Sequence, residues 1–420
     1  MLLIQNGRIV DPVTQTDAIM DVLIDQGTIL QVGKKIEVQA DRIDATGLVI
    51  APGLVDAHVH FRDPGFTYKE DILSGAAAAK KGGFTTVICM ANTKPPVDNS
   101  DTLQCILEKG KQTGIHLYQT ATVTQGMAGR KLVDMEELAR QGAVGFTDDG
   151  LPIMDENVLL KALIKARKLN KPISLHEEDP LFIKQPGVNQ GDVSHQLRYG
   201  GASHTAEDIM VARDAVLALH TGASLCIQHI SSANAVEIVR TFKKLGADIH
   251  AEATPHHFTL TEDAVLKYGT YARMNPPVRT EYDRQKIIEG IQDGTIDMIV
   301  TDHAPHSTEE KSRPLDQAPS GIIGLETSLG LGIHSLVQPG HISLLKLMEL
   351  MSKNPMEFYH LPPVSIQPGQ PADLVLFNEQ ETWIVDQFAS KASNSPFTGW
   401  TLPGKIHYTI CAGKIVYQGD

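Results

Sequence analysis

The sequence predicts an α/β protein, a (β/α)₈ TIM barrel with a small β-sandwich domain built from both chain ends. Between residues 53 and 361, eight short apolar segments alternate with helical patterns, and such alternation forms parallel βα units. Short β segments with turn dipeptides stand at both ends of the chain. The alternative, an open doubly wound sheet, would place a GxGxxG turn after an early strand, and none follows these.

Composition limits the class of protein. The 420 residues carry 37 Lys and Arg against 50 Asp and Glu, a net charge of −13, with 42% apolar residues. A large core can therefore form, and the acidic balance argues against a nucleic-acid partner. We expect no membrane span and no signal peptide, because the chain has no run of 18 apolar residues and no basic, apolar N-terminus. Four scattered cysteines predict reduced thiols in the cytoplasm.

The terminal segments predict the small domain. An Asn6-Gly7 dipeptide inside residues 2–10 predicts a hairpin, and Gln26-Gly27 predicts another within 22–32. Residues 373–377 and 407–417 are short strands, the latter with a turn at Ala412-Gly413. We expect residues 1–52 plus 362–420 to form the small domain and 53–361 the catalytic barrel, with Pro52-Gly53 and Pro362-Pro363 as boundaries.

The predicted barrel strands share one feature: nearly all consist of apolar residues and end in a polar or ionisable residue. In a parallel barrel these ends meet at the carboxyl rim, where such enzymes build their sites. The predicted strands are 53–60, 85–92, 115–123, 143–149, 172–178, 224–231, 248–257 and 298–305, and predicted helices include 70–81, 155–169 and 206–221. The polar ends are His58, His60, Asn92, Asp149, His176, His229 and Asp302.

These strand ends predict a metal centre. His58 and His60 are two residues apart on a strand, so their imidazoles face the same side and can chelate one cation. Six N and O ligands suit two Zn²⁺ ions about 3.5–4 Å apart, with Mn²⁺ or Co²⁺ as alternatives. We expect His58, His60 and Asp302 to hold one ion, His176 and His229 the other, and Asp149 to bridge them. A hydroxide between the ions would be the nucleophile and Asp302 the proton acceptor.

Three longer motifs carry a resemblance to a known family. The runs HVHFRDPG at 58–65, MANT at 90–93 and DHAPH at 302–306 resemble those of the bacterial class I dihydroorotases of the amidohydrolase superfamily. The resemblance covers essentially the whole chain. It implies a zinc-bearing barrel, with two ions per subunit, that interconverts N-carbamoyl-L-aspartate and L-dihydroorotate in pyrimidine synthesis.

The resemblance also implies residue roles. It makes His58, His60, His176, His229 and Asp302 metal ligands, Asp302 the catalytic acid and base, and Asp149 the bridging carboxylate, although a loop could exchange Asp149 with Asp148. Substrate-binding residues would be His60, Arg62, Asn92, Asn275 and His306, together with the backbone of Ser320 and Gly321. An arginine suits this role because its guanidinium binds carboxylates in bidentate fashion.

Simpler interpretations stand beside these roles. Arg62 could pair with Asp63 or Glu70 at the rim, and Asn92 could cap the following loop. For His256 and His257 we expect packing or support of the ligands, since the ligand set is already full. The acidic run at 177–179 predicts a solvated loop start, with support of His176 by Glu177 as the alternative.

Two rival functions differ in testable features. Dihydropyrimidinases, hydantoinases and allantoinases have similar barrels but usually bridge their metals with a carboxylated lysine, and residues 145–150 contain no Lys. A catalytically dead barrel that serves aspartate transcarbamoylase as a structural partner would have lost ligands, whereas this chain retains all six. The sequence leaves open whether the protein forms a homo-oligomer or an active complex with aspartate transcarbamoylase.

Overall fold

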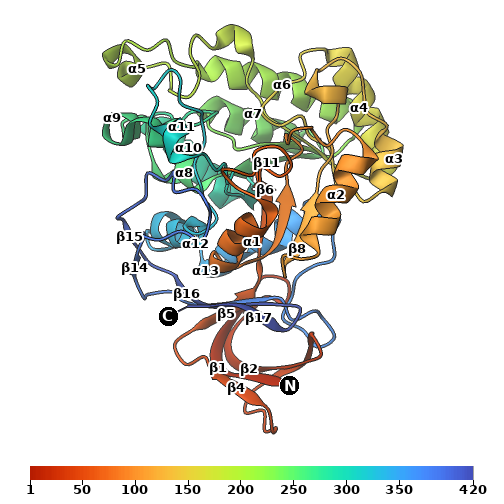
Figure 1. Ribbon diagram of the computed structural model, residues 1–420, viewed down its shortest axis with the longest axis vertical. Coiled ribbons are helices and arrows are strands. Elements are labelled where there is room, and N and C mark those ends of the chain that lie inside the picture. The colour runs from red at the N-terminus through yellow and green to blue at the C-terminus, as the bar shows by residue number, and fades with distance from the viewer. Residues whose placement is uncertain (420) are drawn as a thin grey trace.

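The computed structural model describes residues 1–419 and places a ring of parallel strands, surrounded by helices, above a smaller sheet (Figure 1). Two parallel groups make most of the ring, and single backbone bridges join Phe146 to Ala121 and to Ile173, and His303 to Val59. Over residues 54–303, eight parallel segments therefore close into the predicted barrel. The regular strands are β6 (Leu54–Val59), β7 (Phe84–Cys89), β8 (His116–Gln119), β9 (Ile173–Leu175), β10 (Leu225–Ile227), β11 (Ile249–Ala253) and β12 (Met298–Ile299).

The fourth barrel segment pairs through only a few bonds. Phe146 donates its N–H to Pro172 O at 3.1 Å, and Thr147 donates to Ala121 O at 2.8 Å. The strand predicted at 143–149 is therefore present as a short bridge. The strand predicted at 248–257 ends early, because Pro255 begins helix α8 (Pro255–Thr259) and supplies no N–H to a ladder.

The predicted helices are confirmed. They form α1 (Ile72–Lys81), α4 (Glu156–Leu169) and α6 (His204–Thr221), capped by Asp71, Asp155 and Ser203. The longer remaining helices are α2 (Ser100–Gly110), α3 (Met135–Arg140), α7 (Ala233–Lys244) and α10 (Glu281–Asp293). Short helices are α5 (Asp192–Gln196), α9 (Ala264–Tyr268), α11 (Thr308–Lys311), α12 (Ser328–Gly332), α13 (Leu344–Met348) and α14 (Asn354–Phe358). Across residues 1–419, no helix has the length and apolar character that a membrane crossing needs.

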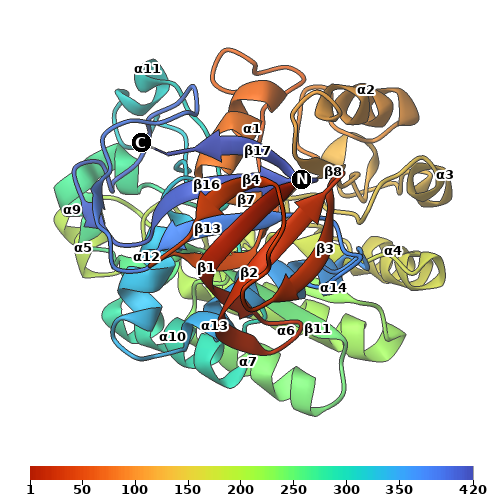
Figure 2. The ribbon, with the colours of Figure 1, turned by 90° about the horizontal axis from the view of Figure 1, so that it is seen from below.

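Both chain ends build the smaller sheet, which lies across the lower end of the barrel (Figure 2). Within residues 1–419 it has eight strands in the order β17-β16-β13-β5-β1-β2-β3, with β4 also paired to β1. The sheet curls until Ile29 of β3 donates to Gln370 O at 2.9 Å, and this encloses an apolar core that includes Ile4, Val22 and Leu374. The strands are β1 (Leu2–Asp11), β2 (Thr16–Asp25), β3 (Thr28–Gly33), β4 (Asp41–Asp44), β5 (Val49–Pro52), β13 (Leu374–Asn378), β16 (Lys405–Cys411) and β17 (Lys414–Gln418).

One predicted hairpin turn is wrong. Asn6-Gly7 lies inside β1, where the pairing with β2 shifts between Ile4 and Gly7, so the dipeptide forms a bulge and no chain reversal. Asn6 has φ 63°, and a Cβ on Gly7 would lie 2.4 Å from Ile50 Cδ1, which is why a glycine is needed there. The turns at Gln26-Gly27 and Ala412-Gly413 are confirmed, since each joins two antiparallel strands.

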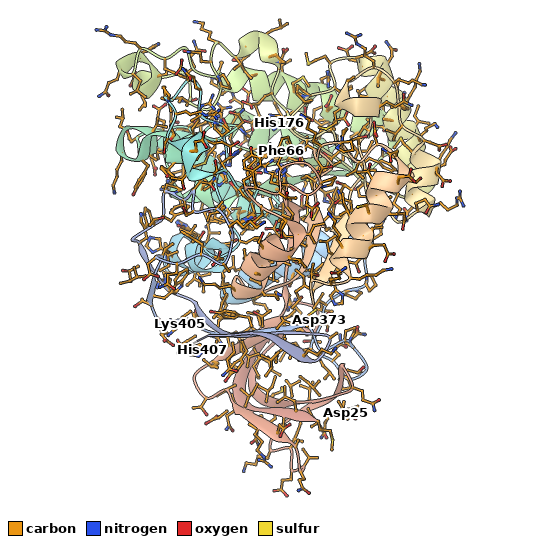
Figure 3. The ribbon with its side chains drawn as sticks, in the orientation of Figure 1. Asp25, Phe66, His176, Asp373, Lys405 and His407 are labelled. Atoms are coloured by element: carbon orange, nitrogen blue, oxygen red, sulfur yellow. The ribbon has the colours of Figure 1, made fainter. Side chains whose placement is uncertain are left out.

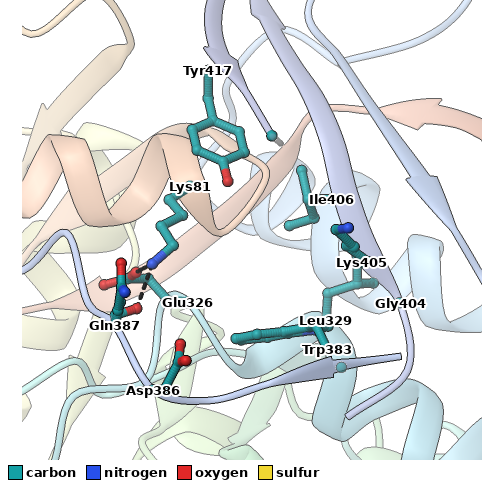
Figure 4. Close-up of a pocket in the computed structure, with 12 residues that line it drawn as sticks. Lys81, Glu326, Leu329, Trp383, Asp386, Gln387, Gly404, Lys405, Ile406 and Tyr417 are labelled. Atoms are coloured by element: carbon teal, nitrogen blue, oxygen red, sulfur yellow. Dashed lines mark hydrogen bonds and ion pairs between the residues drawn. The ribbon is translucent and has the colours of Figure 1, made fainter. Parts of the chain in front are cut away.

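Residues 379–404 leave this sheet and pack against the barrel. They include the short strands β14 (Trp383–Ile384) and β15 (Thr401–Leu402), and Val385 and Phe397 share an apolar cluster with Met274 and Ile322. The domain boundaries at 52 and 362 stay a prediction. A cavity of about 260 Å³ lies between this segment, α1 and α12, but Lys81 in its wall is paired with Glu326 at 2.9 Å (Figure 4). No predicted site residue is among the residues that line this cavity.

Candidate active site

The six predicted metal ligands lie together at the carboxyl ends of the barrel strands. His58 is on β6 and His60 directly follows it, while the other four follow the remaining barrel segments within a few residues. Figure 3 shows His176 in the upper part of the barrel, far from the smaller sheet. All six side chains are buried or nearly so, and Asp302 is the most accessible at 13%.

Two overlapping groups of ligand atoms share Asp149. Its carboxylate lies 3.6 Å from His58 Nε2, 3.4 Å from His60 Nε2 and 3.7 Å from His229 Nε2. One group is His58, His60 and Asp149 and the other is Asp149, His176 and His229, each with ligand atoms within 4.8 Å of one another. Asp149 therefore has the position of a bridging carboxylate.

Asp302 joins the first group. Its Oδ1 lies 3.0 Å from His60 Nε2 and 3.6 Å from His58 Nε2. This carboxylate thus stands at the edge of the ligand cluster, where it can contact both a bound cation and a reacting group.

The hydrogen bonds of the imidazoles test whether a metal fits. His58 donates from Nδ1 to Glu252 at 2.5 Å, His60 from Nδ1 to Asn92 at 2.9 Å, and His176 from Nε2 to Glu178 at 2.9 Å. The other ring nitrogen of each imidazole faces the centre and can bind a cation once it has lost its proton. Among the described residues, the buried His58 Nε2 has no hydrogen-bond partner. This donor set fits a divalent cation such as Zn²⁺.

Electrostatics keep both aspartates ionised. Burial raises the pKa of Asp302, but the hydrogen bond with His60 and the charge of His58 outweigh burial and lower it overall. Burial likewise opposes ionisation of Asp149, yet His58 and His229 hold its pKa well below the ordinary value. Burial lowers the pKa of His58, whereas Glu252 and Asp149 raise it more strongly. The ionised carboxylates of Asp149 and Asp302 therefore balance positive charge at the centre, and a bound cation would take the place of the imidazole protons.

Three site residues have a left-handed backbone. Arg62 has φ 59°, His229 has φ 33° and Asp302 has φ 48°. Side chains other than glycine rarely adopt positive φ, and such strain concentrates at functional sites. The surrounding barrel holds these residues in place, which directs their side chains to the same centre.

A cationic wall lies beside the metal ligands. Arg62 Nη2 is 3.5 Å from His306 Nε2, and Lys69 Nζ donates to His306 Nδ1 at 3.2 Å and to Glu310 at 3.1 Å. His306 Nε2 in turn donates to Ser320 O at 2.8 Å. Burial and the charges of Arg62 and Lys69 lower the pKa of His306 to about 2, so this imidazole is neutral. Arg62 and Lys69 then supply positive charge for an anionic ligand.

The remaining predicted substrate residues surround the same space. Asn92 Nδ2 donates to Asp149 Oδ2 at 3.2 Å while its Oδ1 accepts from His60, so this side chain touches two ligands. Asn275 Oδ1 accepts from Ser320 Oγ at 3.1 Å. Gly321 has φ +115°, and a Cβ there would lie 2.7 Å from Ala304 Cβ. The structure therefore brings all the predicted substrate residues to one rim.

Two buried side chains support the loop that contains Ser320 and Gly321. Lys311 Nζ donates to Pro319 O at 2.9 Å and to Gly321 O at 3.0 Å. Burial, with a contribution from the charge of Arg273, lowers the pKa of Lys311 to about 7. Through these two hydrogen bonds, Lys311 fixes the loop backbone next to His306.

Asn394 supports the same loop from the C-terminal part of the chain. It donates from Nδ2 to Ala304 O and to Gly321 O, both at 3.1 Å, and its Oδ1 accepts from the His306 N–H at 3.1 Å. Asn394 is 2% exposed. One amide therefore joins the segment of His306 to the segment of Gly321.

The structure settles several alternatives. A rim ion pair of Arg62 is excluded, because Asp63 pairs with Lys109 at 2.6 Å and Glu70 lies 3.3 Å from His303. The prediction of a solvated run at 177–179 is wrong, since all three acids are buried. The reason is that this run packs against its neighbours: Glu178, and not Glu177, contacts His176 at 2.9 Å, and Asp179 donates its N–H to Ala206 O of α6 at 3.0 Å.

The His256-His257 pair is buried, as expected for packing or support. His257 Nε2 lies 3.0 Å from Pro276 O, and burial lowers the pKa of His256 to about 4. Both imidazoles are therefore neutral packing groups at the end of β11.

Sequence reasoning missed five supporting residues: Glu252, Glu178, Lys69, Lys311 and Asn394. Glu252 and Glu178 had a usable signal, because a carboxylate in or just after an apolar barrel strand needs a partner when buried. Asn394 had none, since it comes from a segment outside the barrel.

Comparisons with known proteins identify the family of the chain. A model of the Amidohydrolase family matches residues 49–416, and the chain belongs to this family. Relatives named dihydroorotase match it over its whole length. The one from Clostridioides difficile (strain 630) is 58% identical over 420 residues, covering 100% of both chains, and the one from Clostridium acetobutylicum is 48% identical over 422 residues with the same coverage.

Solved structures agree on the fold. An L-hydantoinase (dihydropyrimidinase) from Arthrobacter aurescens superposes with a TM-score of 0.87 at 26% identity, covering 99% of this chain and 96% of that chain. A D-hydantoinase (dihydropyrimidinase) from Thermus sp. gives a TM-score of 0.86 at 22% identity, covering 100% and 95%, and shows the fold alone.

Proposed function

We propose that the chain is a dihydroorotase, a hydrolase that interconverts N-carbamoyl-L-aspartate and (S)-dihydroorotate in the synthesis of pyrimidines (UMP). The observation that carries this function is the convergence of His58, His60, Asp149, His176, His229 and Asp302 beside a cationic wall at one barrel rim. The full-length relatives named dihydroorotase support it.

The substrate's anion determines how it would bind. Both forms of the substrate carry a carboxylate, and we assign it to the guanidinium of Arg62 with Asn275 as a neutral partner. His306 is neutral and donates from Nε2, so it can turn that N–H to a ring carbonyl without adding charge. The backbone at Ser320 and Gly321 would face the ring, held there by Lys311 and Asn394.

The chemistry requires proton transfer to a leaving nitrogen. The six ligands would hold divalent ions, which would supply Lewis acidity to the ring amide carbonyl and would lower the pKa of a water. Asp302 is ionised, so it can accept the proton of the attacking water. It then delivers that proton to the ring nitrogen as the carbon–nitrogen bond breaks, which completes hydrolysis. Ring closure is the reverse, with Asp302 taking the proton from the carbamoyl nitrogen.

Zinc is the metal that we propose, with two ions per subunit. The His and Asp donor set and the shared Asp149 support this number. Cytoplasmic location is also a proposal, supported by four free cysteines. Assembly with further copies or with aspartate transcarbamoylase stays a prediction of the family resemblance.

A hydantoinase or dihydropyrimidinase is the second candidate, because the solved structures named above carry those titles. The deciding feature is the bridge, where Asp149 stands in a segment without lysine.

One experiment tests both candidates. The purified protein should hydrolyse dihydroorotate, lose this activity on chelation and regain it when Zn²⁺ is added. Hydantoin and dihydrouracil should turn over far more slowly in the same preparation. Faster turnover of hydantoin than of dihydroorotate would reverse the assignment.

A further inference from the structure

A second cluster of metal-binding side chains lies at the opposite end of the barrel. His116 is the first residue of β8, Asp373 directly precedes β13, and Cys411 is the last residue of β16. The cluster therefore joins the amino end of a barrel strand to two strands of the smaller sheet. Figure 3 shows Asp373 at this junction and His176 well above it, so the cluster is separate from the candidate active site.

The three side chains meet closely. Their ligand atoms all lie within 4.8 Å of one another, and His116 Nε2 is 2.9 Å from Asp373 Oδ2. Asp373 is 5% exposed and Cys411 is 3% exposed, whereas the His116 side chain is 38% exposed. Two ligands are thus already desolvated, and the third leaves a path from solvent.

An ion pair explains only part of this arrangement. The carboxylate of Asp373 also accepts the N–H of Ala412 at 2.7 Å, so its position is fixed from both sides. The Cys411 thiol has a long contact of 3.8 Å with Thr85 O. The thiol also hydrogen-bonds to the Asp373 carboxylate, so Asp373 contacts both of the other side chains of the cluster.

We propose that His116, Asp373 and Cys411 form a second metal site, which binds one Zn²⁺ with water as the fourth ligand. Imidazole, carboxylate and thiolate are all zinc ligands, and the soft thiolate selects against Mg²⁺ and Ca²⁺. Zn–N and Zn–O bonds of about 2.0–2.1 Å place neighbouring ligand atoms roughly 3.3 Å apart. The contact between His116 and Asp373 would thus open by a few tenths of an ångström.

Binding at this site releases protons. Burial, together with the charge of Asp373, raises the pKa of the Cys411 thiol well above its ordinary value, so the thiol is protonated at neutral pH without a metal. Zinc takes the place of that proton and of the proton shared by His116 and Asp373. The ion would then tie β8 to β13 and β16, and we expect it to stabilise the junction and to leave turnover unchanged.

Cobalt substitution tests the site directly. The protein is stripped of metal and loaded with Co²⁺, which gives a near-ultraviolet charge-transfer band only where a thiolate binds it. The predicted active-site ligands are all N and O atoms, so the band reports the second site alone. We expect the wild-type protein to show the band, Cys411→Ser to lose it, and Cys105→Ser, at an exposed position on α2, to keep it.

Metal counting gives an independent measurement. Wild type should bind one Zn²⁺ more per chain than His116→Asn or Cys411→Ser, and excess Zn²⁺ should raise the melting temperature of wild type more than that of either variant. Both variants should hydrolyse dihydroorotate near the wild-type rate, which separates this proposal from the active-site assignment. If Cys411→Ser fails to fold, His116→Asn still tests the site, because the His116 side chain is partly exposed and its replacement should leave the fold intact. No band in wild type, a band that persists in Cys411→Ser, or equal zinc content in all proteins would overturn the second site.

Discussion

Glu252 is the residue at which the support of the metal ligands can be tested most directly. Its Oε1 accepts from His58 Nδ1 at 2.5 Å and from the His229 N–H at 3.3 Å, so one carboxylate fixes two predicted ligands. Glu252→Gln keeps the shape and one acceptor oxygen but removes the charge that supports His58. Loss of such support costs about 10–100-fold in metal affinity. This corresponds to roughly 1.4–2.8 kcal/mol at 1.4 kcal/mol per tenfold.

The assay is a competition for Zn²⁺ between metal-free protein and a chromophoric chelator. Glu136→Gln, at a side chain that is 67% exposed, is the matched control and should bind like wild type. Melting curves of the metal-free proteins separate weaker metal binding from general unfolding. Equal zinc affinity in Glu252→Gln and wild type, with both folded, would refute the role of this carboxylate.

Four further predictions follow from the same contacts. Asp302→Asn should lower turnover by about 10²–10⁴-fold in steady-state assays, and near-normal activity would remove Asp302 from proton transfer. Arg62→Ala should raise KM for dihydroorotate roughly 10–100-fold, with Arg62→Lys restoring only part of this loss; an unchanged KM would place the carboxylate elsewhere. Asn394→Ala should cost roughly 2–3 kcal/mol of stability on chemical denaturation, because it leaves the buried Ala304 O and the His306 N–H without their hydrogen-bond partner. Burial lowers the pKa of His250, but its contacts with Asp248 and Asp297 outweigh burial and raise this pKa to about 9. The protonated His250 therefore stabilises the folded protein fully below pH 6.5, and this contribution is lost as the pH rises through 9. Wild type should therefore exceed His250→Gln by roughly 2 kcal/mol at pH 6 and match it near pH 10, and a constant difference would contradict this ion cluster.

The sequence predicts the barrel and its rim because both depend on local patterns. Alternation of apolar segments and helices gives the order of the elements, and parallel strands must end at a common rim. His58, His176 and Asp302 could therefore be grouped without knowing any contact between them. The helix caps at Asp71 and Asp155 are equally local, which explains why those helices begin close to where the sequence places them.

Strand ends were harder to predict because the functional residues break the strands. His229 has φ 33° and Asp302 has φ 48°, so β10 ends at Ile227 and β12 at Ile299, before the ligands and before the predicted ends at 231 and 305. A positive φ in a residue other than glycine is imposed by its surroundings and leaves no mark in the sequence. At Asn6-Gly7 the sequence does indicate a positive φ. It does not show whether that φ belongs to a hairpin turn or, as in this structure, to a bulge within a strand.

The supporting residues depend on contacts that only the closed barrel creates. Glu252 lies 194 positions from His58 in the chain, and Asn394 lies 88 positions from His306. A ligand can be recognised from its own chemistry and its place at a strand end, whereas a support is defined by the atom that it orients. In the sequence, Glu252 is an acid in an apolar strand and Asn394 is an amide outside the barrel. Their roles become visible only in the fold, where Glu252 contacts His58 and Asn394 contacts the backbone of His306 and Gly321. The ligand set therefore follows from sequence, and the orientation of each ligand follows from the fold.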